Sequence, residues 1–280
     1  MSSSQWSFNP GTAVRGLALA RETELLLIRG ENHTLTLLNA RGSLQGQTRR
    51  DGLSAADISD DGSAIAAASA DGHLWWLALD LTNRWEARLP AGVLAVALDM
   101  FGQYVVATDK KGGLHLFDRT GRPLGQFECP RPLQFLAFIP TLAQLAASAA
   151  FGWAGCLDLG TGEWVWSDRP VSNAGALAVA AGGDPLLLAC FSDGVRRYGA
   201  GGNHRGPIKL PKPCGLVALD FAGEKGVAAG ASRELFGFDI KGEVTFTREL
   251  PDVPVALALS ARGDRLVCGL ANGVVQALKL

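Results

Sequence analysis

The chain has 280 residues, of which 48% are hydrophobic and 19% are charged, and its formal net charge is -1. A nucleic-acid-binding protein is usually far more basic, so this near-neutral balance argues against nucleic acid as a partner. No stretch approaches the ~20 apolar residues that a membrane-spanning helix needs, so we expect no membrane insertion.

Prolines recur along the chain at intervals of about forty residues. A period of this length is typical of four-stranded propeller blades. The prolines also end segments that read as outer strands, and a strand end on an edge suits proline. The series consists of Pro10, Pro90, Pro130, Pro170, Pro211 and Pro251, with Arg50 at the one position that lacks a proline.

Each unit contains an apolar run, a tight turn and an alternating run, as in residues 64–77, AIAAASADGHLWWL. Asp71-Gly72, Asp193-Gly194 and Asn272-Gly273 supply the positive backbone dihedrals of two-residue hairpin turns. The pattern predicts antiparallel hairpins throughout and no helix. The units begin near Val14, Leu53, Val93, Leu133, Ala174, Gly215 and Val253, which predicts seven blades.

The last unit stops at Leu280, before an outer strand, whereas the chain opens with such a strand in residues 5–10, QWSFNP. We therefore expect residues from about Ser4 to Asn9 to complete the seventh blade, which leaves no free sheet edge at the seam. The predicted fold is an all-β, seven-bladed β-propeller of four-stranded antiparallel blades. It forms a single domain over residues 1–280.

The forty-residue spacing and the Asp-Gly hairpins resemble WD-repeat propellers, although no unit has the Gly-His pair or the Trp-Asp ending of that family. In the family these residues form a buried hydrogen-bond network, so here we expect apolar packing to hold the blades. The resemblance implies a rigid platform in a protein assembly.

One segment of the fourth unit, residues 157–166, LDLGTGEWVW, resembles the docking repeat of quinoprotein-type (PQQ-like) propellers. We interpret it as a structural turn in which Asp158 bonds its own backbone, Gly160 or Gly162 takes a left-handed conformation, and Trp164 or Trp166 packs between sheets. The alternative is a ligand-binding or catalytic propeller with a quinone-like or sugar-like molecule at the channel mouth.

The first strand of each unit is expected to line the central channel, and these strands offer only Arg15, Asp57 and Gln134 as isolated polar residues. An enzyme needs acids, bases or metal ligands that converge, so we expect a non-enzymatic protein without a cofactor. The four histidines come from different units, and the five cysteines form no Cys-x-x-Cys pair, which indicates neither a metal site nor a disulfide framework. The opening segment has no signal-peptide pattern, and we expect a cytoplasmic protein.

Function is then expected on the end faces of the ring. The face that carries the loops between blades gathers more basic than acidic residues, which favours a protein partner with an acidic surface. On this face the fourth and fifth units place aromatic residues in turns, and exposed aromatics beside arginine are typical of interface hot spots. The predicted partner-binding residues are Phe151, Trp153, Phe191, Arg131 and Arg169. The structural alternative is that Trp153 folds inward as a plug and Phe191 packs between sheets.

Overall fold

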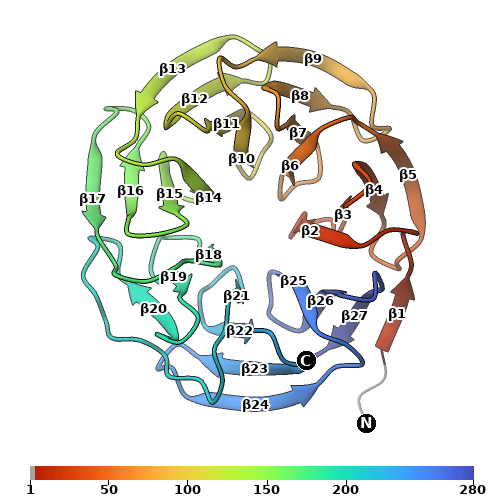
Figure 1. The fold of residues 1–280 in the computed structure, drawn as a ribbon, viewed down its shortest axis with the longest axis vertical. Coiled ribbons are helices and arrows are strands. Elements are labelled where there is room, and N and C mark those ends of the chain that lie inside the picture. The colour runs from red at the N-terminus through yellow and green to blue at the C-terminus, as the bar shows by residue number, and fades with distance from the viewer. Residues whose placement is uncertain (1–3) are drawn as a thin grey trace.

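Residues 4–280, the part of the chain described by a computed structural model, form a ring of seven antiparallel sheets (Figure 1). Each sheet is one blade. The first strand of a blade lies nearest the centre of the ring and the last strand lies on the outside. The predicted all-β, seven-bladed fold is confirmed.

The first three blades follow the repeat without interruption. Blade one contains β2 (Val14–Leu19), β3 (Leu26–Gly30), β4 (Thr34–Leu38) and β5 (Leu44–Arg49). Blade two contains β6 (Leu53–Ile58), β7 (Ile65–Ser69), β8 (His73–Leu77) and β9 (Asn83–Arg88). Blade three contains β10 (Val93–Leu98), β11 (Tyr104–Asp109), β12 (Gly113–Asp118) and β13 (Pro123–Glu128).

The next three blades include one irregular member, the fifth. Blade four contains β14 (Leu133–Ile139), β15 (Gln144–Ala149), β16 (Ala154–Asp158) and β17 (Trp164–Asp168). Blade five contains β18 (Ala176–Val179), β19 (Leu186–Ala189) and β20 (Val195–Tyr198). Blade six contains β21 (Leu216–Leu219), β22 (Lys225–Ala229), β23 (Glu234–Asp239) and β24 (Val244–Glu249).

The fourth strand of blade five is reduced to two isolated bridges, from Tyr198 to His204 and from Val195 to Ile208. Pro207 lies between the bridged residues. Because proline has no N–H group to donate, a regular ladder cannot continue through it. This blade therefore departs from the predicted four strands at its outer edge only.

The seventh blade joins the two ends of the chain. It contains β25 (Pro254–Leu259), β26 (Arg265–Leu270) and β27 (Val275–Lys279), and its outer strand is β1 (Ser4–Phe8). Strand β1 runs antiparallel to β27, with Ser4 opposite Leu278 and Phe8 opposite Val275 (Figure 1). The prediction that the opening segment closes the ring is confirmed.

The core is divided among the seven contacts between neighbouring blades. Buried side chains from blade two, such as Trp76 and Leu74, pack against Val96, Val105 and Phe117 of blade three. Small residues are frequent in the second strands of blades two, four and six, and in blade two Ala66, Ala67 and Ala68 are wholly buried. Their size lets the sheets approach closely near the centre of the ring.

Aromatic residues of several outer strands contact the following blade. Trp6 of β1 donates its indole N–H to the Ala40 carbonyl of blade one, at 3.1 Å, and Trp85 donates to the Arg119 carbonyl of blade three, at 3.0 Å. Trp166 of β17 lies over Gly202, where an added Cβ would stand 2.5 Å from the indole ring. The outer strands therefore hold neighbouring blades together.

One detail of the repeat differs from the sequence interpretation. The Arg50 N–H bonds the His33 carbonyl, just as the Leu89 N–H bonds Gly72, and Leu89 is the residue before a proline. Asp51 therefore stands at the proline position, and the assignment of Arg50 to it was wrong. The Arg50 guanidinium lies 5.1 Å from the Trp75 ring centroid of blade two and donates to the Leu81 carbonyl at 3.0 Å.

Candidate functional site

Two turns on the predicted basic face depart from the pattern of the other blades. In blades one and three, the turn after the second strand bonds the start of its own blade, as Glu31 N–H does with Ala13 O and Lys110 N–H with Gly92 O. In blade four, Phe151 instead pairs with Asn173, which leads into blade five. In blade five, the Phe191 N–H bonds Cys214 O, at 2.9 Å, at the entry to blade six. The first turn therefore crosses the seam between blades four and five, and the second crosses the seam between blades five and six.

The two phenylalanines of these turns remain exposed. Phe151 is 48% exposed and Phe191 is 45% exposed, and Val171, in the loop that enters blade five, is 85% exposed. Phe191 also has a positive φ of 53°, which is uncommon for a bulky residue and costs on the order of 1 kcal/mol. The Phe191 ring rests partly on Gly215 at the entry to blade six, where an added Cβ would stand 2.6 Å from it, so the alternative of packing between sheets holds for one side of the ring. The rest of its surface is exposed and available for an interaction.

Two arginines predicted for this site lie beside the same turns. The Arg131 guanidinium carbon would stand 3.9 Å from a Cβ added at Gly152, so this side chain runs next to the blade-four turn. Arg169 begins the loop that also carries Val171 and Asn173, the partner of Phe151. Both arginines are exposed, and within residues 4–280 neither has an ion pair with an acid. Their charge is therefore free to attract an acidic partner.

Trp153 does not belong to this exposed surface. It is only 3% exposed, and its ring packs edge-on against Trp164 with centroids 4.5 Å apart. Its carbonyl accepts the Ser148 hydroxyl, at 3.1 Å. The inclusion of Trp153 among the partner-contacting residues is corrected in favour of the inward plug, because the turn swings its indole into the core between blades three and four.

We name Phe151, Val171, Phe191, Arg131 and Arg169 the seam patch. Val171 was missed at the sequence level, since a single valine in a loop carries no signal of exposure.

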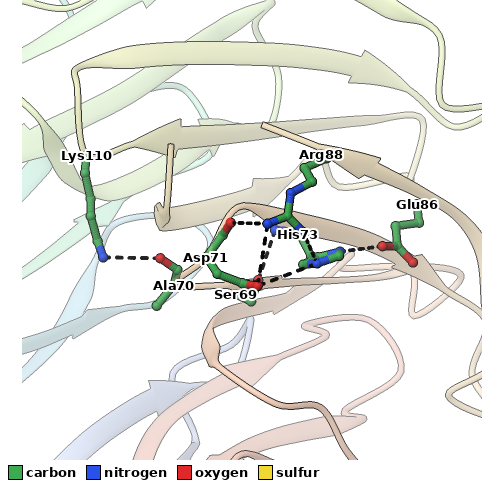
Figure 2. A network of polar contacts seen from close by, with 7 residues as sticks. All are labelled: Ser69, Ala70, Asp71, His73, Glu86, Arg88 and Lys110. Carbon is green, nitrogen blue, oxygen red and sulfur yellow. Dashed lines mark hydrogen bonds and ion pairs between the residues drawn. The ribbon is translucent and has the colours of Figure 1, made fainter. Parts of the chain in front are cut away.

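Polar contacts on the same face also link blades two and three (Figure 2). Ser69 donates its hydroxyl to Asp71 and accepts the His73 backbone N–H, at 2.9 Å. Arg88 donates to Nε2 of His73, so Nδ1 of this ring carries the proton that bonds Glu86. Lys110 of blade three reaches the Ala70 carbonyl at 3.2 Å. Hydrogen bonds therefore stabilise blade two and its contact with blade three in addition to the apolar packing that we expected from the sequence.

A serine near a histidine also resembles the nucleophile and base of a hydrolase, but the Ser69 hydroxyl and the His73 imidazole are both hydrogen-bonded to other side chains. The Ser69 hydroxyl is buried and bonded to Asp71, and the His73 Nε2 atom accepts from Arg88. A nucleophile must be within reach of a base that can take its proton. The Ser69 hydroxyl is bonded to neither ring nitrogen of His73. The network therefore stabilises the turn between β7 and β8.

The turns that resemble quinoprotein repeats serve the blades in which they occur. Asp158 accepts the backbone N–H groups of Gly160 and Thr161, both at 2.9 Å, and Gly162 has a φ of 77°. Trp166 stacks on Tyr198 of blade five, with centroids 5.2 Å apart. The structural interpretation of this segment is supported. In blade three Asp118 stabilises the corresponding turn, which is one residue shorter, by accepting the N–H groups of Thr120 and Arg122.

The central channel contains two cavities that the first strands line. The upper cavity, of about 370 Å³, lies toward the basic face and includes Arg15 and Arg29. The lower cavity, of about 240 Å³, lies toward the opposite face and includes Arg21 and Asp60. Five residues line both cavities and mark the level at which they meet, and these are Asp57, Leu136, Leu177, Val217 and Leu257.

Asp57 interrupts a ring of alanines at this level. The equivalent residue is Ala18 in blade one and Ala97 in blade three, and it is alanine in every other blade as well. The Asp57 carboxylate accepts the Leu98 N–H at 2.8 Å. Burial raises the pKa of Asp57 to about 6, while the bonds from Leu98 and Ile58 oppose the shift. The sequence predicted Asp57 as an isolated polar residue, but Asp60 and Arg21 line the same lower cavity, and the charge of Asp60 raises the pKa of Asp57 while that of Arg21 lowers it.

An ion pair bridges the lower end of the channel. Arg21 donates from Nε and Nη2 to the two oxygens of Asp60, at 2.9 and 2.6 Å. The Arg21 guanidinium also lies 5.1 Å from the ring centroid of Phe221, which belongs to blade six. This side chain therefore extends from blade one toward blades two and six across the lower mouth.

No cluster of three or more metal-ligating side chains occurs within residues 4–280. Nor does this part of the chain form a helix that is long and apolar enough to cross a membrane. Comparison with protein-family models and with curated proteins finds no match, so neither the WD-repeat nor the quinoprotein resemblance is confirmed as a family relationship. The case for function rests on the residues themselves.

Proposed function

We propose that this protein is a non-enzymatic platform for protein–protein interaction and that the seam patch binds a partner with an acidic surface. The observation that carries the proposal is the pair of displaced turns in blades four and five. These turns expose Phe151 and Phe191, and they hold Phe191 in a conformation that costs stability.

The composition of the patch supports binding to a protein. Aromatic residues and arginine are enriched in hot spots, where they combine apolar contact area with directed hydrogen bonds. The unpaired charges of Arg131 and Arg169 would raise the association rate with an acidic surface. The ring supplies a rigid base, because each displaced turn is bonded to the next blade.

The same proposal places the protein in the cytoplasm and assigns it no catalytic role. Its five cysteines are free of disulfide bonds, which suits a reducing compartment. The groups of the blade-two network are occupied by one another, which supports a structural role for them.

Affinity purification from the native cell tests the proposal with matched variants. The double variant Phe151→Ser with Phe191→Asn removes both exposed rings, and asparagine tolerates a positive φ at position 191. The control is Phe101→Ser, which removes a ring that is 53% exposed near the opposite end of the channel.

We expect the double variant to lose partners that wild type and the Phe101→Ser variant both retain, and we expect the retained interaction to weaken at high salt. Identical partner sets for all three proteins would contradict the assignment of the seam patch.

A further inference from the structure

Arg29 reaches the channel from a second strand because its cross-strand partner is a glycine. Gly16 of β2 stands opposite Arg29 of β3. A Cβ added at Gly16 would lie 3.3 Å from Nη2 and 3.5 Å from Nε of Arg29. The guanidinium therefore lies over the Gly16 backbone, and both residues line the upper cavity.

The other blades show that this arrangement is special to blade one. The residues paired at the same register are alanine with alanine in blade two (Ala55 and Ala68) and alanine with threonine in blade three (Ala95 and Thr108). The residue that corresponds to Arg29 is small in each remaining blade as well, and the set is Ser148, Ala189, Ala229 and Gly269. Packing of a blade does not require an arginine at this position.

The Arg29 guanidinium has more N–H donors than there are acceptor groups bonded to it. Nη2 donates to the Arg15 carbonyl at 2.8 Å, whereas a guanidinium carries five N–H donors. Within residues 4–280, no carboxylate forms an ion pair with Arg29, and Arg15 is paired with Glu31. Burial lowers the pKa of Arg29, and the neighbouring charge of Arg15 lowers it further. A negative group beside Arg29 would offset both effects.

We propose that the upper channel cavity binds a small organic anion, whose carboxylate or phosphate group is held by Arg29 and whose apolar part rests on the channel floor. The volume of about 370 Å³ lies within the range of small-molecule sites. The floor is apolar where Leu136, Leu177 and Leu257 line the level between the two cavities. The carboxylate of Asp57 at this level repels an anion, so the charged end stays near Arg29.

This site is independent of the seam patch, and its ligand is a small molecule. The geometry provides an arginine for the charged end and leucines for the apolar end, so both parts of the ligand contribute. Charge-assisted hydrogen bonds are about twice as strong as neutral ones, so the anionic group should dominate the preference between matched ligands.

Isothermal titration calorimetry with hexanoate tests the proposal. Two control ligands each lack one feature of hexanoate. Hexan-1-ol has a chain of the same length but no charge, and inorganic phosphate is an anion without an apolar part. We expect wild type to bind hexanoate at least about tenfold more tightly than either. Equal binding of hexanoate and hexan-1-ol would overturn the proposal, as would binding of inorganic phosphate alone.

The variant Arg29→Ala should lose the preference for hexanoate. Because alanine occupies this position in blades two, five and six, the variant is compatible with the fold. The double variant Gly16→Ala with Arg29→Ala recreates the alanine pair of blade two and should behave in the same way. The control Arg84→Ala removes an exposed arginine of the outer strand β9, outside the channel, and should keep the preference. Unchanged hexanoate affinity in both Arg29 variants would overturn the assignment of Arg29.

Discussion

Asp57 is expected to cost the protein stability at neutral pH, and Asp57→Asn should recover it. The asparagine keeps an oxygen for the Leu98 N–H, which the carboxylate accepts at 2.8 Å, and it cannot ionise. The change therefore removes the charge from the level where the two channel cavities meet and retains the shape of the side chain.

The magnitude follows from the raised pKa of about 6 against an ordinary value of 3.8. A folded-state pKa above the unfolded value means that the folded protein holds the proton longer, so stability falls as pH rises through this interval. Each pKa unit corresponds to about 1.4 kcal/mol, so the loss approaches about 3 kcal/mol at pH 7. For 280 residues the entropy of unfolding is about 0.6 kcal/mol/K, and the difference corresponds to about 5 °C in Tm.

Differential scanning calorimetry of both proteins between pH 4 and pH 8, and of the control from pH 8 down to pH 2, measures this effect. We expect equal Tm values near pH 4 and an advantage for Asp57→Asn that grows up to about pH 7 and then stays constant. The control is Asp118→Asn, because hydrogen bonding by Thr120 lowers the pKa of Asp118 to about 2. That variant should be less stable than wild type at pH 7, and the gap should close toward pH 2. A difference between wild type and Asp57→Asn that does not vary with pH would refute the reasoning.

Three further changes test other parts of the structure. Trp6→Ala removes the clasp from β1 to blade one, and we expect a loss of about 2 kcal/mol, with faster deuterium exchange in β1 and β27. Gly202→Ala places a Cβ against the Trp166 ring at a φ of 78°, which should lower Tm measured by scanning fluorimetry, whereas the exposed Gly201→Ala should change it little. Burial raises the pKa of the Cys129 and Cys268 thiols to about 12, and of Cys156 and Cys214 to about 11, so a thiol reagent at pH 8 should react with these four only after unfolding.

The ring could be predicted from the sequence because every blade carries the same hairpin pattern. Seven copies of a hairpin pattern fix the number of blades, and the spare strand at the start of the chain has one vacant place, beside β27. The irregular edge of blade five was not predicted, because it depends on how Pro207 meets the bridges to Val195 and Tyr198.

The functional residues were predicted less completely. Aromatic residues in turns pointed to Phe151 and Phe191, but the direction in which a turn carries Trp153 depends on backbone geometry that the pattern does not contain. No channel role was predicted for Arg29, because its entry into the channel depends on cross-strand register with Gly16. A residue-by-residue alignment of the seven units would have marked both Arg29 and Asp57 as departures from small residues.

Hydrogen–deuterium exchange of the protein with and without a purified partner shows whether the seam patch receives that partner. Binding at the seam patch should protect residues 149–153, 169–174 and 190–194, the turns and the loop that carry the patch. Protection confined to the opposite face, in residues 99–103 and 139–143, with these segments unchanged, would contradict it.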